Sequence, residues 1–320
     1  MKPLLRHFTA TAPASIGNVG VGFDVLGLAF DAARDKVTAR LIAEPEIRLG
    51  KVSGLVDTLP EAVEKNCALA AAEAVRQRSG AQGGLILDIE KGVPMSAGMG
   101  GSAASAVAAA GAANAALNAG LDDEALLLCA MEGERVSADP PPWDNVMAAL
   151  HGGLVIAARL DPPLIRPLPV PQGLRCVLFH PARKIETQAA RDLLAPQIAL
   201  GIAVEHSRNI ASFVAGCVTQ DLDMVEAGLK DLLIEPQRRP LLPELAQVQA
   251  AALAAGALGC SFSGSGPSVF AFARKDALDN VRHAMVRAFA EAGCPADAYD
   301  APLASDGLRV EIHPQAAEVY

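Results

Sequence analysis

The sequence lacks an excess of basic residues, which argues against a main role in binding nucleic acid or an anionic membrane surface. Its 27 lysines and arginines are outnumbered by 36 aspartates and glutamates, so the formal net charge is -9. We therefore expect neither a nucleic acid nor a membrane as a partner. Any anionic ligand would have to be held by local geometry.

Paired cysteines and a secretion signal are also missing. The cysteines are scattered singly with no C-x-x-C pair, so we interpret them as buried, reduced thiols rather than a disulfide framework. Residues 1–15 contain only two adjacent leucines where a signal peptide would need an apolar segment. Both features predict a cytoplasmic protein. The six cysteines are Cys67, Cys129, Cys176, Cys217, Cys260 and Cys294.

No apolar run is long and continuous enough to suggest a membrane span. The uncharged stretches 92–121 and 246–273 are rich in Ala, Gly and Ser and are interrupted by Pro94 and Pro267. No repeat of fixed period is present either. With 320 residues, 51% of them apolar, the chain is long enough for two compact domains.

The order of expected elements favours an α+β fold, because helices and strands mix without regular βαβ alternation. The Pro-rich stretch 161–173 is the best candidate for a domain junction. Helices are expected at 61–78, 103–120, 122–137, within 187–233, and at 245–255 and 276–292. Strands are expected at 4–13, 21–30, 37–42, 83–92, 154–160, 174–181, around 261–273 and at 308–313.

The segment from Pro94 to Ala103 is the most informative, because it joins a strand to the start of a long helix. Its glycines would let backbone N–H groups approach a polyphosphate, and the helix dipole would add positive charge. It is neither a Walker A loop nor a Rossmann fingerprint. The alternative is a tight connection whose helix is capped by Ser102.

Two further glycine-rich segments could contribute side chains to a cleft. In residues 13–27 the glycines would free Asn18 and Asp24 to bind a hydroxyl and an ammonium group. An Asx turn within a β-hairpin is the alternative there. Residues 256–270 form a second Gly/Ser loop between strands, and only its combination with the others suggests a site.

Together, these segments resemble the GHMP kinase superfamily and, within it, the homoserine kinases. Residues 94–103 are similar to P-x-x-x-G-L-G-S-S-A, and residues 13–27 to P-A-S-x-A-N-x-x-x-G-F-D-x-L-G. Residues 256–270 are similar to G-x-S-G-S-G-P-S/T-x-F-A, and residues 187–194 and 233–243 resemble two more homoserine kinase stretches. The resemblance covers nearly the whole chain.

The resemblance implies a two-domain GHMP kinase fold of the α+β class. Residues 1–160 would form an N-terminal mixed α/β nucleotide-binding domain, and residues 161–320 a C-terminal ferredoxin-like α+β domain. The implied reaction transfers the γ-phosphoryl of ATP to the side-chain hydroxyl of L-homoserine, giving O-phospho-L-homoserine for threonine biosynthesis, with Mg²⁺ bridging phosphate oxygens. A homodimer is plausible from the resemblance alone.

For ATP and the metal, the resemblance assigns residues position by position. Ser102 and Glu134 would hold Mg²⁺, with Glu132 less well aligned. Asn66 would lie near the nucleoside, and the glycine segment would wrap the phosphates. The implied ATP-binding residues are Asn66, Pro94, Met95, Ser96, Ala97, Gly98, Met99, Gly100, Gly101, Ser102 and Ala103.

For the acceptor, the resemblance implies that Asn18 and Asp24 bind the hydroxyl and ammonium of homoserine, and that Arg191 and Arg238 bind its carboxylate. Thr187 would lie near the transferring phosphoryl. Asn18 and Thr187 would position the reactants, and no dedicated catalytic base is required, because phosphoryl transfer depends mainly on alignment and charge stabilisation. Taken singly, the charged residues could equally be solvated side chains on the surface.

The sequence departs from the homoserine kinase pattern in places. Pro142 stands where relatives carry the His of H-x-D-N-V-A-P, and Met99 and Gly101 replace Leu and Ser in the glycine segment. Ser96 and Ala97 replace the usual Gly and Ser. Two alternatives therefore stay open: a GHMP kinase for another small alcohol or amino acid, and a non-catalytic relative that binds a metabolite. Trp143 is interpreted as a packing residue, and the histidines lack metal-ligand spacing.

Overall fold

A mixed sheet is the centre of the N-terminal part of the fold. The computed structural model describes residues 6–303 and 305–314, so residues 4 and 5 of the first expected strand lie outside the described residues. The strands of the sheet are β1 (Arg6–Gly17), β2 (Leu26–Ile42), β3 (Ile47–Gly54), β4 (Gly84–Lys91), β5 (Leu154–Leu160), β6 (Pro163–Leu168) and β11 (Arg309–Pro314). β2 pairs antiparallel with β1, β4 and β5, whereas β3 pairs parallel with β4.

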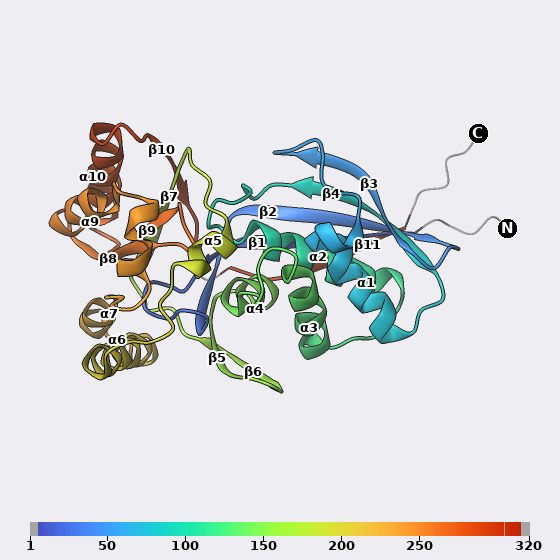
Figure 1. The fold of residues 1–320 in the computed structure, drawn as a ribbon, viewed down its shortest axis with the longest axis horizontal. Coiled ribbons are helices and arrows are strands. Elements are labelled where there is room, and N and C mark those ends of the chain that lie inside the picture. Colours follow the sequence, from blue (N-terminus) through green and yellow to red (C-terminus); the bar gives the residue numbers. More distant parts are fainter. Residues whose placement is uncertain (1–5, 304, 315–320) are drawn as a thin grey trace.

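Four helices cover one face of this sheet (Figure 1). They are α1 (Cys67–Ser79), α2 (Gly101–Ala116), α3 (Asp123–Glu134) and α4 (Trp143–His151), and the 3-10 turn η1 (Val63–Lys65) precedes α1. α2 is apolar on nearly every side and lies buried between the sheet and its neighbours, as such a helix must. The small alanine side chains of α2 allow α1, α3 and β1 to pack close to the backbone of this helix.

The C-terminal sheet has the order β10-β7-β9-β8 and is antiparallel throughout. Its strands are β7 (Leu174–Pro181), β8 (Ala257–Phe262), β9 (Val269–Arg274) and β10 (Ala296–Asp300). Helices α9 (Leu245–Ala254) and α10 (Leu278–Glu291) pack on it, on the side away from the N-terminal sheet (Figure 1). This chain order and pairing are those of a ferredoxin-like βαββαβ unit, which confirms the expected fold class.

The remaining helices follow β7 in the chain. They are α5 (Thr187–Asp192), α6 (Leu200–Thr219), α7 (Leu222–Gly228), α8 (Glu235–Arg238) and the 3-10 turn η2 (Arg239–Leu241). α5 lies between the two sheets in Figure 1, whereas α6 and α7 pack on each other at the edge of the molecule. Within the described ranges, no helix combines the length and the apolar character needed to cross a membrane.

Some expected elements need correction. The strands expected at 21–30 and 37–42 are one long strand, β2, and residues 21–25 form a turn before it. The helix expected at 122–137 is α3, which ends at Glu134, ahead of the proline cluster. The helix α4 was not expected and starts directly after Pro142, where a missing N–H has no cost. Five cysteines are buried thiols as expected, but Cys67 is partly exposed. Trp143 packs against the core, as predicted.

The boundary between residues 160 and 161 stays a prediction. β6 lies within the Pro-rich stretch and pairs with β5, and β11 pairs with β1, so both extend the N-terminal sheet although they follow residue 160. The chain thus returns to its first sheet after it has completed the second.

A buried ion pair ties the central strands to α2. Lys91 at the end of β4 contacts Asp35 on β2, and its ammonium also donates to the Gly101 carbonyl and the Ser105 hydroxyl, both at 2.8 Å. Asp35 accepts the backbone N–H of Gly92 at 3.0 Å and is fully buried. The two charges are therefore neutralised and hydrogen-bonded where water cannot reach them, directly beneath the glycine segment.

We expect Asp35→Asn to lower the free energy of unfolding by about 3–5 kcal/mol, because it leaves the Lys91 ammonium buried without a counter-charge. The control is Glu90→Gln, which removes the half-exposed ion pair between Lys36 and Glu90 and should cost at most about 1 kcal/mol. Urea unfolding of both variants measures the difference. Equal losses would contradict the assignment of Asp35 as an essential partner.

Candidate active site

One cavity of about 360 Å³ brings together most of the residues singled out in the sequence. Its walls come from the glycine segment, the β1–β2 turn, the ends of α1 and α3, the start of α4, and α5 and α8. Pro94, Met99 and Ala103 are outside its lining. Of the expected site residues, the lining contains Asn18, Asp24, Asn66, Met95, Ser96, Ala97, Gly98, Gly100, Gly101, Ser102, Glu134, Thr187, Arg191 and Arg238.

The glycine segment is hydrogen-bonded directly to the other two glycine-rich loops through its backbone carbonyls. The Ser15 N–H donates to the Met99 carbonyl at 2.9 Å, and the Ser263 hydroxyl donates to the Gly98 carbonyl at 2.6 Å. Gly100 has φ +68°, and a Cβ there would lie 2.0 Å from the Ser15 hydroxyl oxygen. Only glycine permits this approach, which explains why three segments far apart in the sequence form one site.

The start of α2 faces the cavity, and its first helical residues line it. Gly100, not Ser102, is the N-cap residue, so the alternative in which Ser102 caps the helix is wrong. No acidic residue lies in the first turn. The free N–H groups and the helix dipole therefore present positive potential to the cavity, as a phosphate site requires.

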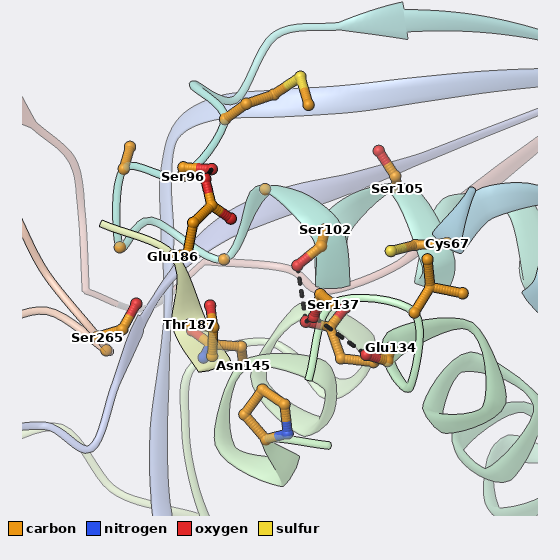
Figure 2. Close-up of a pocket in the computed structure, with 18 of the residues that line it drawn as sticks. Cys67, Ser96, Ser102, Ser105, Glu134, Ser137, Asn145, Glu186, Thr187 and Ser265 are labelled. Atoms are coloured by element: carbon orange, nitrogen blue, oxygen red, sulfur yellow. Dashed lines mark hydrogen bonds between the residues drawn. The ribbon is translucent and has the colours of Figure 1, made fainter. Parts of the chain in front are cut away.

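Glu134 is buried at the end of α3 and aimed at the start of α2 (Figure 2). Its Oε1 accepts the hydroxyls of Ser102 at 2.6 Å and Ser137 at 2.7 Å. Its Oε2 is buried and has no hydrogen-bond partner within the described residues. Burial raises the pKa of this carboxyl to about 7 despite the two hydroxyl donors. A carboxylate oxygen with no partner beside a hydroxyl is a donor set that fits Mg²⁺.

Asp24 and Arg191 form a bidentate ion pair at the other end of the cavity. The Arg191 amino groups donate to the two Asp24 oxygens at 3.0 and 2.8 Å. Arg238 is 2% exposed and donates to the Ala190 and Gly264 carbonyls at 3.2 and 3.0 Å. Burial, and after it the charge of Arg191, lower the pKa of Arg238 to about 10. Neither arginine is the solvated surface side chain that the alternative interpretation assumed.

Asn18 is held from two sides. Its backbone N–H donates to the Asp144 carboxylate at 2.7 Å, and its side-chain amide donates to the Gly264 carbonyl at 2.9 Å. Its φ of +66° places it in the turn between β1 and β2, and the residue lines the cavity. Burial and the nearby charge of Asp24 raise the pKa of Asp144 to about 7.

Asp144 is a cavity residue that the sequence analysis missed. The signal was its position directly after the proline cluster, in the D-N that relatives share, but no role followed from it. Its Oδ1 also accepts the backbone N–H of Asn145 at 2.9 Å. Lys91 and Glu186 likewise line the cavity and were not singled out.

Two more expected residues reach the cavity from its rim. Asn66 caps α1 by accepting the Ala68 N–H at 3.0 Å, and its amide donates to the Pro60 carbonyl at 2.9 Å. Thr187 is the first residue of α5, directly after Glu186. Figure 2 shows Glu186 facing Ser96 of the glycine segment, whose hydroxyl donates to it at 3.1 Å.

Comparisons with known proteins agree with this geometry. The family models for the GHMP kinase N-terminal domain and C-terminal domain match residues 66–153 and 213–291. A homoserine kinase of Xylella fastidiosa is 41% identical over 309 residues, which is 96% of this chain and 95% of that protein. A homoserine kinase of Xanthomonas campestris is 41% identical over 307 residues, covering 96% and 94% of the two chains.

A solved structure is similar over the same extent. The crystal structure of a homoserine kinase from Cytophaga hutchinsonii superimposes with a TM-score of 0.89 at 36% identity and covers 95% of this chain and 97% of that one. A mevalonate kinase from L. major, at 19% identity and a TM-score of 0.66, shares the fold. The similarities to homoserine kinases extend over nearly the full chain, and the chain belongs to the homoserine kinase family of the GHMP kinase superfamily.

Proposed function

We propose that the protein transfers the γ-phosphoryl of ATP to the side-chain hydroxyl of L-homoserine and releases O-phospho-L-homoserine. The observation that carries the proposal is a single cavity with a helix N-terminus at one end and a carboxylate with two arginines at the other. A phosphate donor and a zwitterionic acceptor need these two ends. The homoserine kinase relatives support the choice of acceptor.

The ATP phosphates would lie on the glycine segment, against the N–H groups at the start of α2. Their negative charge would meet the helix dipole at the start of α2. The Lys91 ammonium supports this segment through its hydrogen bond to the Gly101 carbonyl, while Asp35 balances its charge. Asn66, on the lining beside Cys67, would contact the nucleoside. In this way an acidic protein can bind a polyanion without a basic surface.

Glu134 and Ser102 would hold Mg²⁺, which supplies charge neutralisation between phosphate oxygens when bound. The buried Oε2, which has no hydrogen-bond partner among the described residues, supports this assignment, because an unpaired buried carboxylate oxygen is costly unless a ligand completes it. Ser137 would keep the carboxylate aimed at the cavity through its 2.7 Å hydrogen bond to Oε1.

Homoserine would replace the ion pair between Asp24 and Arg191 with matching contacts. Its ammonium would face Asp24, and its carboxylate would face Arg191 and Arg238. Asn18 would orient the hydroxyl, and Thr187, at the start of α5, would contact the transferring phosphoryl. A sugar or an isoprenoid alcohol lacks the charge pair that these side chains require.

The chemistry would then depend on alignment. The residues named above fix the hydroxyl and the phosphate relative to each other and exclude water, and none of them has to act as a dedicated base. O-Phospho-L-homoserine would serve threonine biosynthesis. A homodimer stays a prediction of the family resemblance.

The direct test is ADP production from Mg·ATP by the purified protein with L-homoserine, beside L-serine, L-threonine, mevalonate, galactose and a blank without acceptor. We expect turnover with homoserine well above every other acceptor. Turnover with a different acceptor would keep the fold and the phosphate site but discard homoserine, an outcome to which Pro142 in the lining gives some weight. If the folded protein produced no ADP with any acceptor, a non-catalytic metabolite-binding role would be favoured.

Gly100→Ala should lower kcat/KM for ATP at least about tenfold, because its Cβ would meet the Ser15 hydroxyl at 2.0 Å and displace the glycine segment. Gly120→Ala is the matched control. Gly120 has nearly the same φ, +65°, but no atom lies within 4 Å of a Cβ placed there. Steady-state kinetics that found both variants equally impaired would refute the close-approach argument.

Glu134→Gln should flatten the pH dependence of stability in the ligand-free protein. Burial raises the pKa of Glu134 from 4.5 to about 7, so the folded state keeps a proton that the unfolded state releases between these values. The free energy of unfolding therefore falls as pH rises through this window. Urea unfolding between about pH 5 and 8 should show a smaller fall in the variant. Asp144 lowers the free energy of unfolding over the same pH range in the wild type and in the variant. An identical pH dependence in both proteins would contradict the raised pKa of Glu134.

A further inference from the structure

Phe23 lies in the β1–β2 turn and lines the cavity next to Asp24. The guanidinium carbon of Arg191 is 5.3 Å from the centre of its ring, and that of Arg238 is 5.2 Å away. Both distances are within the range in which the negative face of an aromatic ring attracts a cation. One aromatic side chain thus contacts both arginines of the acceptor end.

The two arginines need such a partner because their charges repel each other. They approach from different elements, α5 and α8, and the charge of Arg191 is one cause of the lowered pKa of Arg238. Asp24 neutralises Arg191 through two hydrogen bonds. Arg238 instead donates to the carbonyls of Ala190 and Gly264, and no carboxylate of the described residues forms an ion pair with it.

Donor capacity is left over for a ligand. Within the described residues, the Arg191 Nε is buried and has no hydrogen-bond partner. The Arg238 Nε and Nη1 donate to the two carbonyls named above, so its Nη2 can donate to a ligand. A carboxylate that accepted from both guanidinium groups would satisfy the buried Nε and relieve the repulsion between the two charges.

We propose that Phe23 is a positioning residue that holds Arg191 and Arg238 together for the α-carboxylate of the acceptor, and that it thereby sets the preference for carboxylate-bearing acceptors. The inference rests on the proposed function, since it concerns how that acceptor is selected. A leucine at this position would fill space without presenting a negative face. The two guanidinium groups would then separate, and the carboxylate would lose one of its two partners.

The test compares L-homoserine with 3-aminopropan-1-ol, which is homoserine without its carboxylate. In Phe23→Leu we expect kcat/KM for homoserine to fall between about 3-fold and 30-fold through a higher KM. The value for 3-aminopropan-1-ol should stay within about twofold, because that acceptor makes no carboxylate contact. Phe23→Tyr keeps the aromatic face and should restore most of the ratio between the two acceptors.

A general loss of structure would lower both values together, which would overturn the proposal. The control for that case is Phe213→Leu. Phe213 is fully buried in α6 and outside the cavity lining, so its substitution should lower Tm without changing the ratio of kcat/KM between the two acceptors. An unchanged ratio in Phe23→Leu, with wild-type turnover of homoserine, would reject the role of Phe23 and leave the proposed function intact.

A second readout does not depend on turnover. In protein with ¹⁵N-labelled arginine, the ring current of Phe23 should shift the side-chain signals of Arg191 and Arg238 in the native protein and in Phe23→Tyr. Phe23→Leu should release both shifts. If the wild-type protein does not phosphorylate homoserine, the proposed function fails, and these spectra still decide whether Phe23 holds the two arginines. Signals unchanged in Phe23→Leu would overturn the inference.

Discussion

The site depends on the close approach of three backbone segments, which only glycine permits. The Met99 and Gly98 carbonyls accept hydrogen bonds from Ser15 and Ser263, and the Cβ positions of Gly98 and Gly100 lie within 2.4 Å and 2.0 Å of neighbouring atoms. Each contact joins one of the other two glycine-rich loops to the glycine segment. These contacts hold the three loops together around one cavity.

Two buried carboxyls in the cavity differ in whether the fold satisfies both of their oxygens. The pKa of Asp144 and that of Glu134 are both raised to about 7 by burial. Both oxygens of Asp144 accept backbone N–H groups, so its cost is offset within the fold. Glu134 keeps one oxygen without a partner in the described part of the chain, which is the observation behind its proposed role as a cation ligand. The fold thus satisfies both oxygens of the first carboxyl but only one oxygen of the second.

The order of strand, glycine segment and helix around residues 84–116 could be predicted from the local sequence pattern. The ferredoxin-like second half and the placement of Arg191 and Arg238 in one site were instead implied by the resemblance to homoserine kinases. The helix α4 was not predicted, because three consecutive prolines read as a stop, whereas Pro142 only precedes the first helical turn. Asp144 and Phe23 were missed for a related reason. Their importance comes from what the fold brings beside them, namely the Asn18 N–H and two guanidinium groups.

The same geometry shows where the altered positions of the glycine segment lie. Met99 is fully buried and outside the cavity, so its exchange for leucine concerns core volume, which cores tolerate. A Cβ on Gly101 would lie 2.8 Å from the Pro94 carbonyl oxygen, so glycine fits the tighter turn here. Ser96 lines the cavity and returns a hydroxyl one position before the serine that Ala97 replaces. The departures change side chains in the core at Met99 and in the cavity lining at Ser96, Ala97 and Gly101, whereas α2 begins at Gly101 and its first N–H groups stay at the cavity.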